Sequence, residues 1–217
     1  MRVLLLVCVV VLSAALSGCT GSKPKPPHLT PQQAQDKSKQ GLDLAKAGKY
    51  EEAGKVLEQV AQSDQAGVAD AATYVALGIT RYQKKEYPGA LAAYDQAIKL
   101  NPTLPEPYQG KANIYRDQKN LKEAEVWYRK AWQASPQFVD AYTELALQLS
   151  LANRMPDAIA VLNEGVTRNP GNVTLQLNLA SFYSQDGQKA AAKRIYEAIL
   201  KVDPSNKDAK DALAALK

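Results

Sequence analysis

The sequence predicts an all-α solenoid, an elongated fold in which similar helical units stack one after another. Small residues recur every 34 residues along most of the chain, and prolines recur with the same spacing. The repeated residues are Ala90, Ala124, Ala158 and Ala192, and Pro102, Pro136, Pro170 and Pro204. Self-similarity at a fixed period of this size indicates a repeat architecture, because each unit can bury its apolar face only against its neighbours.

The N-terminal segment, residues 1–18, reads as a signal peptide. Arg2 precedes an apolar run of 14 residues, from Val3 to Leu16. A membrane-spanning helix needs roughly 20 apolar residues, whereas a signal peptide needs only a short apolar core after a basic start. The run ends in the letters LSGC, which place Cys19 at its border. A disulfide is excluded, because the only other cysteine is Cys8, inside the same run.

The LSGC stretch resembles the lipobox of bacterial lipoproteins, which is a branched apolar residue, two small residues and a cysteine. The resemblance implies cleavage before Cys19 and attachment of diacylglycerol and acyl chains such as palmitate to this cysteine. It also implies an envelope location, and Thr20 in the next position favours the outer membrane, facing the periplasm, over the inner membrane. The alternative is an ordinary secretory signal that happens to end near a cysteine.

Residues 19–33 are predicted to be an acylated cysteine followed by a linker. Four prolines fall between Thr20 and Gln33, with no apolar periodicity. Such composition favours an extended tether over a packed element.

The clearest repeat unit, residues 71–104, reads AATYVALGITRYQKKEYPGALAAYDQAIKLNPTL. Small residues stand at its positions 8, 20 and 27, where two helices would approach closely. Large residues at positions 4, 11 and 24 would fill the space around them, and proline at position 32 would end the second helix. This pattern resembles the tetratricopeptide repeat family, in which each repeat is a pair of antiparallel helices.

The resemblance covers residues 34–217 and implies about five helix pairs followed by a C-terminal capping helix. Lys111 departs from the family pattern at a position where leucine is usual, and we expect its stem to pack while its amine reaches water. The array spans 34–206 and the cap spans 207–217. The predicted repeats are 34–70, 71–104, 105–138, 139–172 and 173–206.

The chain offers no recognisable catalytic or cofactor chemistry. Its single histidine lies in the linker, and the repeat region has no cysteine and no glycine-rich phosphate loop. The formal net charge of +5 is a mild excess and does not indicate nucleic acid, which requires clustered basic residues. We therefore expect a non-enzymatic, monomeric binding protein without metal, cofactor or nucleic-acid partner.

In the tetratricopeptide family the first helix of each pair lines a concave groove, chiefly through repeat positions 2, 5, 6, 9, 12 and 13. The resemblance implies apolar walls on either side of a polar band, which suits an amphipathic helix or an extended peptide. Gln109, Asp117, Thr143 and Glu144 stand at further groove positions. The predicted groove residues are Val75, Ile79, Tyr82, Asn113, Arg116, Leu147, Leu151, Leu177 and Asn178.

The sequence thus predicts a lipid-anchored periplasmic scaffold that binds envelope proteins or their peptide segments. By resemblance, such lipoproteins help to assemble or localise envelope machines of the pilus or secretion type, as the pilotins of type IV pilus secretins do. Two alternatives remain open. One is an adaptor for peptidoglycan enzymes, and the other is a carrier or chaperone whose groove holds an apolar peptide or lipid-like ligand.

Overall fold

The computed structural model describes residues 28–63 and 69–216 of the chain. These residues form eleven helices and no strand, so the all-α prediction is confirmed for the described part. The predicted signal peptide, Cys19 and most of the predicted linker lie outside the described residues, as do the extra residues expected in the first repeat near 64–68. The helices are α1 (Pro31–Lys46), α2 (Tyr50–Ala61), α3 (Ala71–Gln83), α4 (Tyr87–Leu100), α5 (Glu106–Asp117), α6 (Leu121–Ala134), α7 (Val139–Leu151), α8 (Met155–Arg168), α9 (Val173–Gln185), α10 (Lys189–Val202) and α11 (Lys207–Ala215).

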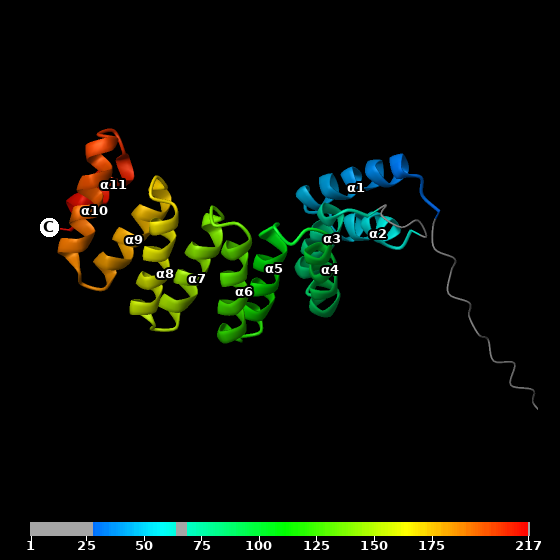
Figure 1. The fold of residues 1–217 in the computed structure, drawn as a ribbon, viewed down its shortest axis with the longest axis horizontal. Coiled ribbons are helices and arrows are strands. Elements are labelled where there is room, and N and C mark those ends of the chain that lie inside the picture. Colours follow the sequence, from blue (N-terminus) through cyan, green and yellow to red (C-terminus); the bar gives the residue numbers. More distant parts are fainter. Residues whose placement is uncertain (1–27, 64–68, 217) are drawn as a thin grey trace, which may run out of the picture.

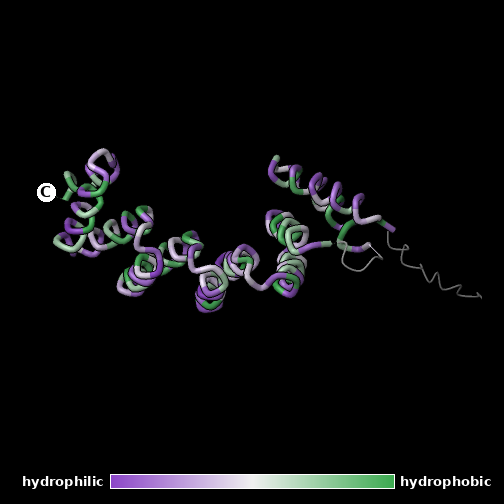
Figure 2. Tube along the Cα trace, turned by 45° about the horizontal axis from the view of Figure 1, so that its top comes forward, coloured by the Kyte–Doolittle hydropathy of each residue, from purple (hydrophilic) through white to green (hydrophobic). Residues whose placement is uncertain are grey.

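The helices pair in chain order and the pairs stack into a curved array (Figure 1). The odd-numbered helices form an inner layer, in which α1 contacts α3, α3 contacts α5 and α7 contacts α9. The even-numbered helices α2 to α10 form the outer layer. Seen from the second angle, the trace is an arc whose two ends rise on the same side (Figure 2). Helix α11 covers the end of the last pair by packing on α10 and α9.

The first helix begins earlier than the sequence suggested. Thr30 caps α1 through a reciprocal pair of hydrogen bonds with Gln33, and Pro31 occupies the first turn. Proline is harmless there because the first N–H groups of a helix have no intrahelical partner. Leu29 is buried against Ala34 and Val60. The last residues assigned to the linker therefore belong to the folded array.

The turn inside each pair repeats the same backbone geometry. Its first residue after the helix cap has a positive φ, between 58° and 78° in all five pairs. The next N–H then donates to a carbonyl five residues earlier, as from Glu86 to Arg81 at 2.9 Å. This is the Schellman arrangement, which satisfies carbonyls at the end of a helix. The positive-φ residues are Gly48, Lys85, Lys119, Asn153 and Gly187.

Glycines allow α3, α4 and α5 to approach one another around one aromatic ring. Tyr94 of α4 is 1% exposed, and its ring lies against the backbone of Gly78 in α3 and of Gly110 in α5. A Cβ atom at either glycine would come well inside 3.0 Å of the ring atoms. Contact within the α3–α4 pair and contact between this pair and α5 therefore depend on the absence of a side chain at these two positions.

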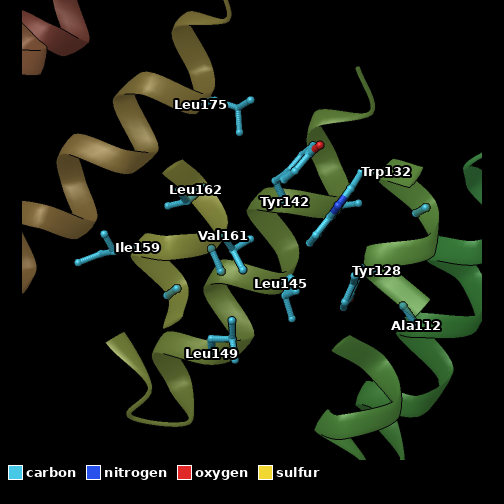
Figure 3. Close-up of a cluster of buried hydrophobic side chains, with 14 of the residues drawn as sticks. Ala112, Tyr128, Trp132, Tyr142, Leu145, Leu149, Ile159, Val161, Leu162 and Leu175 are labelled. Carbon is cyan, nitrogen blue, oxygen red and sulfur yellow. The ribbon is translucent and has the colours of Figure 1, made fainter. Parts of the chain in front are cut away.

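The largest apolar core spans α5 to α9 (Figure 3). At its centre the rings of Trp132 and Tyr142 are stacked, with centroids 4.4 Å apart and an angle of 9° between their planes. Both side chains are fully buried. Because Trp132 belongs to α6 and Tyr142 to α7, the stack joins two successive repeats, as the solenoid architecture requires.

We predict that Gly78→Ala and Gly54→Ala change stability in opposite directions. Alanine at 78 gains helix propensity but overpacks Tyr94, so we expect the free energy of unfolding to fall by about 1–3 kcal/mol. Alanine at 54 would meet only a methyl group of Thr80 at 3.4 Å. It should raise stability by up to about 1 kcal/mol, because alanine favours the helix interior. Urea unfolding followed by circular dichroism measures both, and a Gly78→Ala protein as stable as the Gly54→Ala protein would contradict the close packing of Tyr94.

Candidate protein-binding face

The inner layer leaves several large apolar side chains in contact with solvent. Ile79 of α3 is 41% exposed, and Leu147 and Leu151 of α7 are 45% and 71% exposed. Val75, Leu177 and Asn178 are half-buried. Exposed apolar side chains on one concave face are typical of an interaction surface. Binding by these residues stays a prediction, and the structure defines where they lie.

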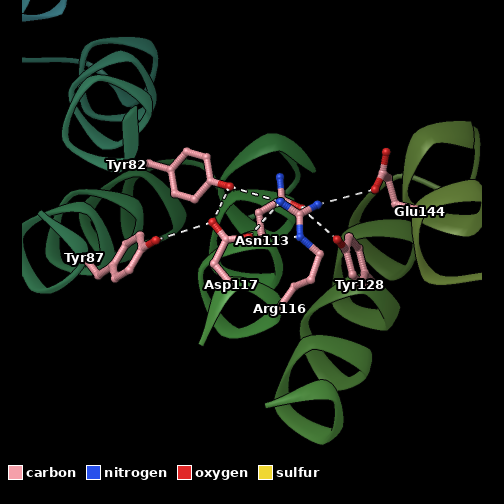
Figure 4. Close-up of polar contacts among 7 residues, drawn as sticks. All are labelled: Tyr82, Tyr87, Asn113, Arg116, Asp117, Tyr128 and Glu144. Carbon is pink, nitrogen blue, oxygen red and sulfur yellow. Dashed lines mark hydrogen bonds and ion pairs between the residues drawn. The ribbon is translucent and has the colours of Figure 1, made fainter. Parts of the chain in front are cut away.

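The inner layer also holds a polar network centred on Arg116 (Figure 4). Arg116 donates to the Tyr82 hydroxyl at 3.0 Å and to Asp117 at 3.0 and 3.1 Å. It also donates to Asn113 at 3.2 Å and forms an ion pair of 3.5 Å with Glu144. The network therefore connects α3, α5 and α7, which belong to three successive repeats.

Two further tyrosines, both from outer helices, complete the network. The Tyr128 hydroxyl of α6 donates to Asn113 Oδ1 at 2.7 Å. The Tyr87 hydroxyl of α4 donates to Asp117 Oδ2 at 3.4 Å, and the Tyr82 hydroxyl donates to the same oxygen at 2.8 Å. Asp117 thus accepts from both tyrosines and from Arg116, so its charge is compensated within the protein.

This geometry changes the role of three predicted groove residues. Tyr82, Asn113 and Arg116 lie on the inner layer as expected, but they are bonded to one another. The guanidinium group of Arg116 has five N–H groups, and contacts to Tyr82, Asn113, Asp117 and Glu144 occupy them. Arg116 therefore connects neighbouring repeats, and none of its N–H groups is left to bind a ligand carboxylate.

A cleft of about 430 Å³ opens beside this network, between the α5–α6 turn and the end of α7. Leu151 and Leu121 give it apolar walls, and Asp117 and Lys119 stand at its polar side. Its volume lies within the range of small ligand pockets, and it is large enough to receive a side chain from a partner. The cleft and the exposed leucines of α7 are adjacent parts of one surface.

Burial raises the pKa of tyrosine hydroxyl groups in the network. Burial and the hydrogen bond to the Asp117 carboxylate together raise the pKa of Tyr82 to about 12, because both disfavour the phenolate. The pKa of Tyr128 is also raised, chiefly by burial. Both hydroxyl groups are therefore protonated donors throughout the physiological range.

A second cluster joins α5 to the outer helices α4 and α6, and in it Lys111 departs from its predicted position. The sequence placed its amine in water, but Lys111 is only 6% exposed, and its amine forms an ion pair with Asp95. The same amine lies 3.7 Å from the ring centroid of Trp127, and Lys130 lies 3.9 Å from it. A buried lysine requires such partners, and the aromatic face with the carboxylate supplies them.

Residues 28–63 and 69–216 contain no group of three or more His, Cys, Asp or Glu side chains that could hold a metal ion. Within the same ranges, no helix combines the length and apolar character needed to cross a bilayer.

Comparison with known proteins identifies the class. Family models described as tetratricopeptide or TPR repeats match residues 78–111, 105–138 and 149–216, which together make up more than half of the chain. The chain belongs to the tetratricopeptide repeat family, whose members are generally non-catalytic scaffolds that bind peptides or proteins in a groove.

The chain is similar to the curated small glutamine-rich tetratricopeptide repeat-containing protein 2 of Mycosarcoma maydis, with 30% identity over 101 residues. That match covers 46% of this chain and 29% of the fungal protein, so the chain spans less than a third of that relative's length.

Several solved structures share the fold. The C-terminal part of a TPR repeat-containing protein of Cytophaga hutchinsonii is 19% identical with a TM-score of 0.66, over 86% of this chain and 73% of that one. The pilF protein of Pseudomonas aeruginosa is 17% identical with a TM-score of 0.61, over 86% and 90%. YrrB, described as a TPR protein with an unusual peptide-binding site, is 14% identical with a TM-score of 0.53, over 82% and 91%. At these identities the likeness concerns the fold.

We predict that stability falls with rising pH between about 10 and 12 and that Tyr82→Phe flattens this fall. An unfolded tyrosine has a pKa of about 10, and the folded value for Tyr82 is about 12. A raised folded pKa contributes stability below pH 10 that is progressively lost as pH rises toward 12. Thermal unfolding midpoints between pH 8 and 12 for both proteins give the measurement. Parallel curves would show that Tyr82 is not protected by the network.

Proposed function

We propose that the chain is a non-enzymatic scaffold that binds segments of partner proteins on its inner face. The observation that carries this proposal is the exposure of Ile79, Leu147 and Leu151 on one face of a folded repeat array. Exposed apolar surface favours association, and here it adjoins a cleft of about 430 Å³ that is lined by Leu121 and Leu151. Membership of a family of protein-binding scaffolds supports the same function.

We further propose that the scaffold is attached to a bacterial outer membrane through lipid on Cys19 and faces the periplasm. The support is the LSGC stretch after a short apolar run, which lies outside the described residues. A membrane anchor would hold the inner face near envelope partners and raise its effective concentration there. On this basis the partner would be an envelope protein, and the resemblance to pilotin-type lipoproteins leads us to propose a machine of the pilus or secretion type.

If lipid is attached to Cys19, both palmitate incorporation and membrane association should depend on this residue. In a bacterial host, the wild-type protein should incorporate radiolabelled palmitate and sediment with the outer-membrane fraction. Cys19→Ser should incorporate no label and leave that fraction, because the thiol is the acylated group. Cys8→Ser, inside the same apolar run, is the matched control and should behave as wild type. Equal labelling of Cys19→Ser and wild type would exclude lipidation at this residue.

The binding face predicts site-selective capture in cells. A photoactivatable residue at Ile79, Leu147 or Leu151 should crosslink one dominant envelope protein, identified by mass spectrometry. The same residue at Lys122, exposed on the outer helix α6, should not capture it.

The identity of the captured protein separates the candidate functions. A secretin or pilus subunit supports the scaffold for such a machine, and a peptidoglycan enzyme would replace it with the adaptor. Equal capture from Lys122 and from the inner sites would show that the inner face is not the binding surface.

A further inference from the structure

From α3 to α10, charge is divided unequally between the inner and the outer helices. The inner helices α3, α5, α7 and α9 carry three basic and four acidic residues, and α9 carries no charge. The outer helices α4, α6, α8 and α10 carry nine basic and six acidic residues. Across these four pairs the inner helices therefore carry a net charge of −1 and the outer helices one of +3. The first pair differs, because α1 carries three basic and two acidic residues and α2 carries one basic and three acidic residues.

The three basic side chains of these inner helices are all engaged with protein carboxylates. Arg81 pairs with Glu58 at 2.8 Å, Lys111 pairs with Asp95 on the outer side, and Arg116 pairs with Asp117 and Glu144. In contrast, Glu106 and Asp140 are exposed and form no ion pair with any described residue. Across α3 to α9, the uncompensated charge of the inner layer is thus negative.

The hydrogen bonds at the centre of the face also indicate negative charge there. Arg116 has no spare N–H, and the hydroxyl groups of Tyr82, Tyr87 and Tyr128 all donate within the network. One carboxylate oxygen of Glu144 accepts a hydrogen bond from Arg116. Its other oxygen has no hydrogen-bond partner among the described residues. At the centre of the face the acceptor left free is this Glu144 oxygen, so a ligand bound there must supply the donor, while the cation that lines the cleft without an ion pair to a described residue is Lys119.

Acidic and apolar groups follow one stripe of α7. Asp140, Glu144, Leu147 and Leu151 are spaced by four, three and four residues, which places them on the same side of a helix. The acidic pair occupies the start of the helix and the exposed leucines occupy its end, beside the cleft at Leu121. A ligand lying along this stripe would meet carboxylates and then an apolar surface.

We propose that the inner face from α3 to α7 selects a basic amphipathic protein segment, one that carries Lys or Arg beside apolar side chains. The apolar residues would cover Ile79, Leu147 and Leu151, and the basic residues would pair with Glu106, Asp140 and Glu144. Complementary charge at an interface selects partners and register more than it adds raw affinity. This inference rests on the proposed function, and adds the chemistry of the partner to it.

A library of random 16-residue peptides displayed on phage, selected on immobilised full-length protein, tests the proposal. The charge-reversed variant is Glu106→Lys with Asp140→Lys. The matched control is Glu123→Lys with Asp208→Lys, because these acids also lie in the first turns of their helices but on α6 and α11. A third protein, Leu147→Gln with Leu151→Gln, removes the apolar part of the face.

Wild type and control should enrich the same peptides, rich in Lys or Arg and in apolar residues. The charge-reversed variant should bind the best of these about tenfold more weakly, which corresponds to about 1.4 kcal/mol, and should enrich acidic peptides instead. The leucine variant should lose enrichment, while its circular dichroism spectrum and unfolding midpoint stay close to wild type.

The remaining outcomes separate the two claims. Neutral or acidic peptides that depend on the leucines would overturn the charge inference and leave the binding face in place. Enrichment that survives in the leucine variant would overturn both, as would the absence of any enriched peptide. Self-association of the wild-type protein that is lost in the charge-reversed variant would identify the occupant as the basic outer face of a second copy, and would equally overturn the proposal.

Discussion

The array depends on helices approaching closely where small side chains face a large one. Tyr94 shows the constraint in its tightest form, because its ring fills the space between the backbones of Gly78 and Gly110. Since one of these glycines is in the same pair and the other is in the next, a single side chain sets the spacing both within and between repeats. Once that spacing is fixed, the inner helices align along one surface, and residues 34 positions apart become neighbours.

The Arg116 network uses that alignment. Tyr82 and Arg116 occupy equivalent positions of successive repeats, and their direct hydrogen bond is a consequence of the 34-residue period. The ion pair between Arg116 and Glu144 connects α5 to α7, and Arg116 also lines the cleft. A long, five-donor side chain is suited to this task, because it bonds several acceptors at once while its charge remains compensated. The polar band predicted for ligand contact is therefore partly structural.

Much of the fold could be predicted from the sequence, because small residues and prolines at fixed repeat positions determine which helices meet and where they end. The early start of α1 was also readable, since Thr30 and Gln33 form a capping box, but the neighbouring prolines favoured a linker. For Lys111 the repeat pattern showed only a departure from leucine. Its burial depends on Asp95 and Trp127, which come from two other helices and meet only in three dimensions. Likewise, the groove positions of the family identified Arg116. The acceptors that bind its N–H groups could not be predicted, because they depend on side-chain geometry.

That distinction determines what the inner face can recognise. Were Arg116 free, the face would present a cation at its centre and suit a carboxylate. Because Asp117 and Glu144 engage it, the centre presents an acceptor instead, and the unpaired Glu106 and Asp140 extend the negative charge along the face. The same ion pairs that connect three repeats therefore determine the electrostatic preference of the face, which the polar band predicted from the sequence left open. In a repeat protein, interactions that hold the units in register and interactions that select a partner share one surface, so the first set limits the second.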